Sequence, residues 1–239
     1  MKILFEGTIS VKAALESRCR QVKQIWMDET KKTKDFGYIL TIAQKLNIDV
    51  ERVDAEVINK MAKGKTHGGV IAEVTERRYL RIQDFDFGEK PFFVLIEGIE
   101  DAYNLGYSFR TLYAAGCNAV FVLQPFHNDE MILSKSSAGA SEKMPVVLLR
   151  DVEGGLKYLI DKGVRVICAD RKDAIEMYDV DYQTGILIAV GGPKRGLSQS
   201  VSRFCNQNIY IPYATDYRNS LSASSAISII AYEVYRQRR

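Results

Sequence analysis

Six continuous apolar runs mark the chain after residue 91. A run of about five apolar residues is typical of a strand buried on both faces of a parallel sheet. Helix-like patterns lie between several runs, over 104–115, 130–138, 153–161 and 222–236. Strands that alternate with helices predict βαβ units and a mainly parallel sheet. The six runs are FFVLI, NAVFVL, MPVVLL, VRVICA, GILIAV and NIYIP.

The first 80 residues carry shorter and more mixed patterns, which predict a separate small α/β unit. We expect helices over 9–17, 35–46 and 55–61, and strands over 22–27, 49–53 and 70–74. A charged stretch follows over 76–91, and its Gly88 and Pro91 favour irregular backbone. We therefore predict an α/β protein with a small domain over 1–80, a linker over 81–91 and a larger domain over 92–239.

Composition is that of an ordinary soluble globular protein. Apolar residues make up 46% and charged residues 26% of the 239. The longest apolar runs are too short to cross a bilayer, and the N-terminal stretch lacks the long apolar core and cleavage site of a signal peptide. We therefore expect a cytoplasmic protein without membrane contact.

The cysteines and histidines exclude several kinds of site. Four cysteines lie far apart, and the chain has only two histidines. The number and spacing of these residues exclude the common zinc-binding motifs and argue against a Ser/His/Asp hydrolase. We expect no metal, and cysteines that are small buried residues in a reducing compartment.

The net charge of +3 says little, but its distribution is uneven. Residues 1–80 hold 15 Lys and Arg against 11 Asp and Glu, whereas the rest hold 18 against 19. A basic first third is consistent with a domain that faces a polyanion, and equally with an ordinary solvated surface.

Three loops follow predicted strands, at the edge where open parallel sheets bind ligands. In the first, over 97–116, Asp101 or Asn104 can cap the next helix, and Arg110 projects beside its apolar stripe. A guanidinium there suits an oxyanion, although a surface Arg with no such role fits the same pattern. The second loop reads VGGPKRGLS and is either a tight turn or a close backbone approach to a ligand. It is not a GxGxxG fingerprint.

The third loop leads from NIYIP into SLSASSAIS, where five serines surround the start of the last predicted helix. Hydroxyls and free N–H groups at a helix start can hold polar ligand atoms. The alternative is that one serine caps the helix while the others are small packing residues.

In order and spacing, the three loops resemble the three motifs of the SpoU/TrmH family of RNA ribose 2′-O-methyltransferases, within the SPOUT superfamily. The first family motif is matched by Asn104, Gly106 and Arg110, and the second by GGPKRGLS. The third is matched by IPYATDYRNSLSASSA with the later YEVYRQ. The first third, which ends in HGGVIAEV, is similar to the small RNA-binding domain, itself similar to ribosomal proteins, that precedes the catalytic domain in this family.

The resemblance implies a C-terminal trefoil-knot methyltransferase domain, S-adenosylmethionine held in the knot, an RNA substrate, and a homodimer that packs through the knot and the last helix. It implies cofactor contacts made largely by main-chain groups of Gly191, Ile211 and Leu221. The neighbouring cofactor-site candidates are Gly192, Gly196 and Ser220.

The resemblance also assigns chemistry. Arg110 is expected to position the RNA phosphate and stabilise charge, since a guanidinium is a poor base. Asn104 is expected to orient the loop or the ribose. RNA contacts are expected from basic residues of the first third and the linker, namely Lys63, Lys65, His67, Arg77 and Arg78.

Two positions depart from the family pattern. Pro193 stands where the second motif usually has Glu, and Ser222 where the third usually has Asn. Pro193 also lacks an N–H, so the bonding of its loop must differ. Ser222, which we expect to be a catalytic residue together with Arg110 and Asn104, still offers a hydrogen-bond donor and an acceptor. The leading prediction is an S-adenosylmethionine-dependent methyltransferase acting on rRNA or tRNA; the alternative is a non-catalytic RNA-binding protein on the same scaffold. A weaker third possibility is a nucleotide-binding α/β enzyme unrelated to RNA.

Overall fold

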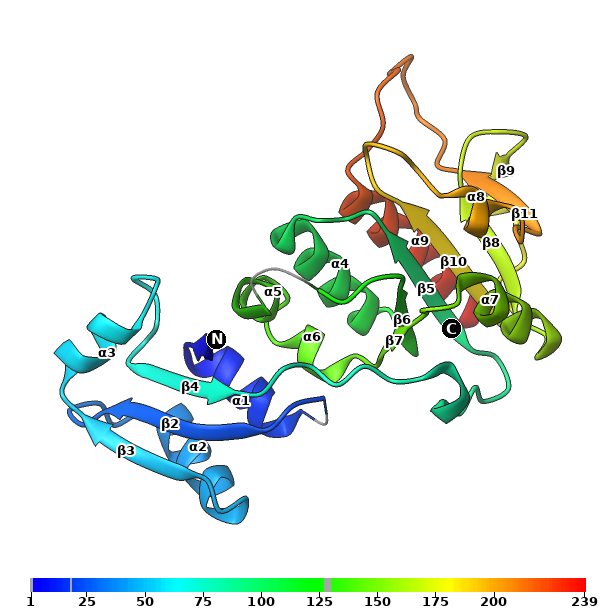
Figure 1. Ribbon diagram of the computed structural model, residues 1–239. Coiled ribbons are helices and arrows are strands. Elements are labelled where there is room, and N and C mark those ends of the chain that lie inside the picture. The colour runs from blue at the N-terminus through cyan, green and yellow to red at the C-terminus, as the bar shows by residue number, and fades with distance from the viewer. Residues whose placement is uncertain (1, 18, 127–129) are drawn as a thin grey trace. The chain divides into compact units, whose positions relative to one another are not determined.

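The computed structural model describes residues 2–17, 19–126 and 130–239. The chain forms two compact units (Figure 1). The first comprises the residues up to Arg78 together with the described part of 127–143, and the second comprises 79–126 and 144–239. The sequence-based division placed all residues after 91 in one domain, so it differs from this division at 127–143.

The first unit is built on a four-stranded mixed sheet in the order β1-β4-β2-β3. β4 runs antiparallel to β1 and β2, and β2 runs parallel to β3. The side chains of Thr33 and Asp54 cap α2 and α3 by accepting from the amides of Phe36 and Glu56. The elements are β1 (Ile3–Glu6), α1 (Thr8–Glu16), β2 (Val22–Asp28), α2 (Lys34–Lys45), β3 (Asp49–Val53), α3 (Ala55–Met61) and β4 (Val70–Val74).

Two further helices of the first unit come from far along the chain. These are α5 (Glu130–Ser136) and α6 (Ala140–Lys143), which pack against α1. At one contact Gly139 lies directly on Ala13, where a Cβ on Gly139 would come within 2.6 Å of the Ala13 Cβ. The sequence predicted a helix at 130–138 but gave no sign that it belongs to the first unit.

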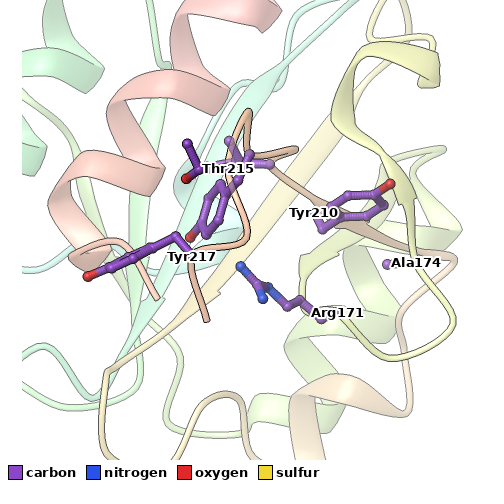
Figure 2. A pocket seen from close by; sticks show the side chains of 7 residues that line it. Arg171, Ala174, Tyr210, Thr215 and Tyr217 are labelled. Atoms are coloured by element: carbon purple, nitrogen blue, oxygen red, sulfur yellow. The ribbon is translucent and has the colours of Figure 1, made fainter. Parts of the chain in front are cut away.

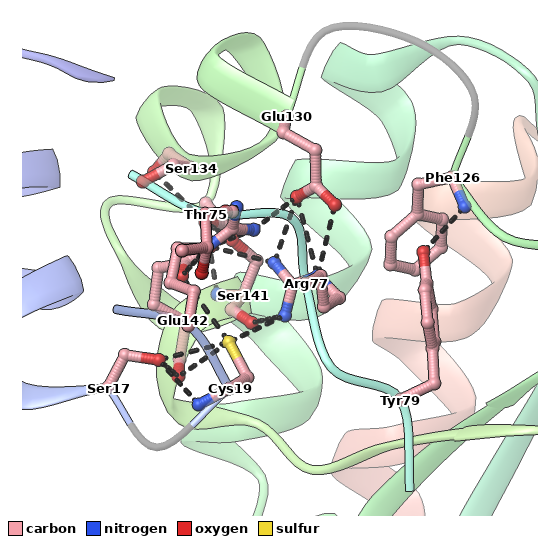
Figure 3. Close-up of polar contacts among 12 residues, drawn as sticks. Ser17, Cys19, Thr75, Arg77, Tyr79, Phe126, Glu130, Ser134, Ser141 and Glu142 are labelled. Atoms are coloured by element: carbon pink, nitrogen blue, oxygen red, sulfur yellow. Dashed lines mark hydrogen bonds and ion pairs between the residues drawn. The ribbon is translucent and has the colours of Figure 1, made fainter. Parts of the chain in front are cut away.

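Buried ion pairs join this segment to the rest of the unit (Figure 3). The side chains of Arg20 and Arg77 are 0% and 1% exposed. Arg20 donates from Nε to Glu142 at 2.6 Å, and Arg77 donates from Nη2 to Glu142 at 2.7 Å. Both guanidinium groups also donate to Glu130. Burial acts to lower the pKa of Arg77, but Glu142 and Glu130 outweigh it and raise the pKa.

The structure contradicts the prediction that Arg77 contacts RNA. Its guanidinium is enclosed and already satisfied by two carboxylates and by the carbonyl of Ser141, to which it donates at 2.8 Å. Arg77 stands in a charged stretch of sequence that is typical of an exposed segment. The carboxylates that neutralise it, Glu130 and Glu142, come from a distant part of the chain, so the sequence pattern does not indicate its burial.

The second unit contains a seven-stranded sheet in the order β7-β6-β5-β10-β8-β11-β9, in which every strand pair is parallel. Its strands are β5 (Phe92–Glu97), β6 (Ala119–Val122), β7 (Val146–Leu148), β8 (Arg165–Ala169), β9 (Ile175–Glu176), β10 (Ile186–Gly191) and β11 (Gln207–Tyr210). Its helices are α4 (Ala102–Ala114), α7 (Val152–Asp161), α8 (Gln199–Ser202) and α9 (Ala223–Arg238), with short 3-10 turns η1 (Ile82–Asp84) and η2 (Met177–Asp179).

Helices cover both faces of this sheet (Figure 1). Phe93 and Leu187 point to the face covered by α7 and α8, whereas Phe92 and Ile188 point to the face covered by α9. This two-residue alternation explains why the strands read as unbroken apolar runs, since both faces are buried. All strands being parallel, β5, β10 and β11 end at the same edge.

The four cysteines are free thiols; Cys117 and Cys168 are buried, and the other two are half-buried. Burial raises the pKa of the Cys117 thiol to about 12, so it is an inert core residue. None of the described helices is long and apolar enough to cross a membrane. Within the described ranges, no group of three or more His, Cys, Asp or Glu is arranged to hold a metal ion.

The buried ion pairs make a prediction about stability. Glu142→Gln removes a charge that two buried guanidinium groups share, and breaking a buried pair from one side typically costs about 3–5 kcal/mol. We expect a loss of this order in the free energy of unfolding, measured by urea denaturation of the full chain. The matched control is Asp35→Asn, which alters an exposed pair with Lys12 and should change stability little. Equal effects of the two substitutions would contradict the account.

Candidate functional site

The glycine-rich loop after β10 folds back on itself. The amide of Gly196 donates to the carbonyl of Gly192 at 3.0 Å, and these residues form an isolated antiparallel bridge. Gly196 has φ +64, which favours glycine. Glu97, at the end of β5, accepts from the amide of Ser198 at 2.8 Å. The loop is therefore fixed to the neighbouring strand by a charge-assisted hydrogen bond.

Main-chain segments approach each other here more closely than side chains would allow. A Cβ on Gly192 would lie 2.6 Å from the carbonyl carbon of Gly98, and closer still to its oxygen. A Cβ on Gly191 would overlap the backbone of Gly196 and Leu197. Gly191 and Gly192 must therefore be glycines because the backbone passes too close for a side chain, whereas Gly196 is favoured by its positive φ.

The first loop leads into α4 through a side-chain cap. Asp101 accepts from the amide of Asn104 at 2.8 Å, so Asp101, and not Asn104, is the cap. The Oδ1 of Asn104 is left to accept from the hydroxyl of Ser224 at 3.3 Å. Leu105 and Phe109 are buried as predicted, and Arg110 is exposed on the adjacent face of α4.

The serines at the start of α9 make different contacts. Ser222 is the cap and accepts from the amide of Ser225 at 3.1 Å. Ser224 meets Asn104 of α4, and the hydroxyl of Ser228 lies 3.1 Å from that of Thr111, also in α4. One serine therefore caps the helix while two others pack α9 against α4.

A cavity of about 350 Å³ lies beside the ends of β8 and β11 (Figure 2). Arg171 extends from the segment after β8 towards the chain that follows β11, and its guanidinium stacks 4.8 Å from the ring centre of Tyr213. The hydroxyl of Tyr213 accepts from the amide of Leu221 at 3.1 Å, which ties the third loop to the start of α9. The lining residues are Arg171, Ala174, Tyr210, Ile211, Tyr213, Thr215 and Tyr217.

The structure brings together part of the predicted site. Gly191, Gly192 and Gly196 form one tight turn, and Asn104 meets the start of α9. Ile211 lines the cavity, and Leu221 is bound to Tyr213 of the same wall. Ser220 is exposed, and its hydroxyl forms no hydrogen bond with the other described residues. These assignments remain predictions as far as a bound cofactor is concerned.

The RNA-contact candidates other than Arg77 are accessible. Lys63, Lys65 and Arg78 are exposed and His67 is half-buried. Lys63, Lys65 and His67 lie in the loop between α3 and β4 of the first unit.

Sequence reasoning missed three residues of the site. They are Glu97, which holds the glycine loop, and Arg171 and Tyr213, which stack at the cavity. Each stands at or just beyond the carboxyl end of a predicted strand, so a systematic inspection of strand ends would have found them.

Comparison with known proteins agrees with this geometry. The model of the SpoU rRNA methylase family matches residues 91–232, more than half of the chain. The chain belongs to the SpoU rRNA methylase family. A second model, described as RNA 2′-O ribose methyltransferase substrate binding, matches residues 4–80 of this SpoU protein. The family predicted from the three loops is confirmed.

Individual relatives cover nearly the whole chain. The putative TrmH family tRNA/rRNA methyltransferase YacO of Bacillus subtilis is 27% identical over 225 residues, which is 92% of this chain and 90% of that protein. The 23S rRNA (guanosine-2′-O-)-methyltransferase RlmB of Photobacterium profundum is 28% identical over 240 residues, with 98% and 97% covered.

Solved structures share the fold. The SpoU methyltransferase AviRb of Streptomyces viridochromogenes, in complex with the cofactor AdoMet, matches with a TM-score of 0.83 at 19% identity over 99% of this chain and 90% of that one. The AdoMet-bound rRNA methyltransferase of Sinorhizobium meliloti also has a TM-score of 0.83, at 20% identity over 98% and 87%. The predicted fold class of this SpoU chain is thereby confirmed.

The backbone crossing predicts the effect of one methyl group. Gly192→Ala places a Cβ on the backbone of Gly98, and overpacking of this kind typically costs about 1–3 kcal/mol. We expect that loss in urea unfolding. The control Gly37→Ala lies within α2 with nothing near its Cβ position, and it should be neutral or stabilising by up to about 1 kcal/mol. A neutral Gly192→Ala would show that the crossing is not tight.

Proposed function

We propose that this SpoU protein transfers a methyl group from S-adenosylmethionine to a ribose 2′-hydroxyl of rRNA or tRNA. The observation that carries the proposal is the meeting of the three loops, after β5, β10 and β11, at one edge of a parallel sheet. Gly98 contacts Gly192, Asn104 bonds to Ser224, and Tyr213 bonds to Leu221. The match of residues 4–80 to a substrate-binding model supports an RNA substrate.

The loop after β11 lines a cavity of about 350 Å³, which is in the usual range for small-molecule sites, roughly 300–1,000 Å³. Of the predicted cofactor-site residues, Ile211 lines this cavity, and the glycine loop after β10 is not part of its lining. Main-chain groups of Gly191 and Ile211 would hold the ligand. Because the Leu221 amide already donates to Tyr213, Leu221 has its carbonyl to offer. When bound, S-adenosylmethionine supplies a methyl group on a sulfonium, so the chain needs only to align donor and acceptor and to accommodate a proton.

Arg110 and Asn104 are the residues we assign to the RNA side. Arg110 is exposed at the α4 surface, and no described carboxylate forms an ion pair with it, so its guanidinium is available to a phosphate. Asn104 accepts from Ser224, which leaves its amide N–H groups for the ribose or the loop. Ser222 Oγ accepts the Ser225 amide as a helix cap, so any part it plays towards substrate uses its remaining capacity.

The assignment of Arg110 predicts a loss of methyl transfer. Arg110→Ala should lower incorporation of labelled methyl from S-adenosylmethionine into rRNA or tRNA by about 100-fold, the scale expected when a substrate is mispositioned. Arg150→Ala, another exposed arginine of the same unit, serves as the control and should be unaffected. An active Arg110→Ala protein would remove this residue from its proposed role.

A second candidate function rests on the departures at positions 193 and 222. The loop after β10 has no carboxylate at Pro193, and Glu97 is occupied by the Ser198 amide. A non-catalytic RNA-binding protein would bind RNA without methyl transfer. Activity that appears only in the Pro193→Glu, Ser222→Asn double variant would favour this candidate.

We propose that the active form is a cytoplasmic homodimer. Large apolar side chains are exposed along the adjacent helices α4 and α9, an arrangement typical of an interface. A second copy that covers these helices would bury them, in keeping with the dimer implied by the resemblance. The exposed side chains are Tyr103, Tyr107, Tyr113, Ile229, Tyr232 and Tyr235.

The dimer proposal predicts the effect of a buried charge. Tyr232→Glu should shift the mass measured by light scattering from dimer towards monomer, because an unpaired carboxylate is costly to bury. Tyr178→Glu is the matched control, since Tyr178 is similarly exposed, at 52% against 50%, but lies outside α4 and α9. A monomeric wild-type protein, or no shift with Tyr232→Glu, would contradict the proposed interface.

A further inference from the structure

We propose that the loop over 62–69 and four lysines around it form the surface with which the first unit binds RNA phosphates. This lysine cluster consists of Lys31, Lys63, Lys65 and Lys135. The inference rests on the proposed function in that it takes RNA as the polyanion, and it adds that α5, from the stretch between β6 and β7, is part of the RNA-binding surface.

The lysines converge on the loop from three parts of the chain. Lys135 of α5 donates from Nζ to the hydroxyl of Thr66 at 2.6 Å. Lys31, just after β2, donates to the carbonyl of Gly68 at 3.1 Å, and its side chain lies over Gly69. Lys63 and Lys65 belong to the loop itself. Positive charge from distant sequence positions is therefore gathered at one place.

None of these lysines is held in a direct ion pair with a described carboxylate, although Asp28 lies near Lys31; the hydrogen bond from Thr30, and then the charge of Lys31, lower the pKa of the Asp28 carboxyl. No member of the lysine cluster forms an ion pair with any carboxylate among residues 2–17, 19–126 and 130–239. Elsewhere in the same unit Lys2 and Lys23 pair with Glu73, and Lys12 pairs with Asp35. Lysines whose ammonium groups hydrogen-bond to a neutral hydroxyl or carbonyl, rather than to a carboxylate, remain able to attract a polyanion.

A buried carboxylate holds the backbone of the loop that carries the lysine cluster. Glu6, only 2% exposed, accepts from the amides of Lys63 at 2.6 Å and Gly64 at 3.3 Å. The amide of Gly69 donates to Nδ1 of His67 at 3.1 Å. The carboxylate of Glu6 is thus directed at the backbone, while the lysine side chains project outwards from a fixed scaffold. Order of this kind lowers the entropy lost on binding.

The buried ion pairs explain why Lys135 is present at this surface. Arg20 and Arg77 bind Glu130 at the start of α5 and Glu142 in α6. With both ends of the 130–142 segment fixed in this way, α5 presents Lys135 to Thr66. The buried ion pairs therefore position one member of the lysine cluster, Lys135, at this surface.

The test is the salt dependence of RNA binding by the full-length protein. The probe is a fluorescein-labelled RNA hairpin, and the affinity is measured over a series of salt concentrations. Each lost phosphate contact lowers the slope of log K against log salt by about 0.7–0.9, so Lys65→Ala with Lys135→Ala should lower it by about 1.4–1.8. The control pair is Lys45→Ala with Lys157→Ala, two exposed lysines outside the cluster, and it should keep the wild-type slope.

A second variant separates charge from loop structure. Thr66→Val removes the bond to Lys135 but keeps both charges, so it should retain the wild-type slope. A slope for the cluster variant equal to that of the control pair, or a loss reproduced by Thr66→Val, would overturn the inference. Methyl transfer by the wild-type protein is measured separately: its absence would refute the proposed function, whereas an unchanged slope with intact methyl transfer would refute only this surface.

Discussion

The close crossing of backbone at Gly98 and Gly192 is the constraint on which the site depends. β5 and β10 are parallel neighbours, and the chain that leaves each must turn at the same edge within reach of the other. The carbonyl of Gly98 occupies the position that a side chain at residue 192 would need. The groups that face this edge are consequently peptide groups. Glu97 then uses a carboxylate to hold the turn through the Ser198 amide rather than to meet a ligand.

The need for small side chains also explains the serines around the start of α9. Ser222 satisfies a free amide at the helix start, while Ser224 and Ser228 are small enough to let α9 lie against α4 and hydrogen-bond with it. In the first unit the corresponding interaction is electrostatic. Arg20 and Arg77 are buried with Glu130 and Glu142, and these ion pairs hold the segment that contains α5 and α6 against the rest of the unit. Each arrangement brings together pieces of chain that are far apart in sequence.

Much of the fold could be predicted from the apolar pattern, because strands buried on both faces are continuous runs and long amphipathic helices have a clear period. The predicted strand at 49–53 and the predicted helix at 55–61 have the same bounds in the structure. Short elements such as β1 and β9 carry too few residues to show a period. The place of α5 and α6 in the first unit, the burial of Arg77 and the stacking of Arg171 on Tyr213 depend on contacts between distant residues, which periodicity does not encode.

The central claim is that a site made of main chain, without a carboxylate at position 193, holds S-adenosylmethionine. Calorimetric titration of the purified full-length protein with this cofactor tests it most directly. The account predicts saturable binding, with one cofactor per chain, in the absence of RNA. A titration that gives no heat of binding at millimolar cofactor, both with and without added RNA, would contradict it.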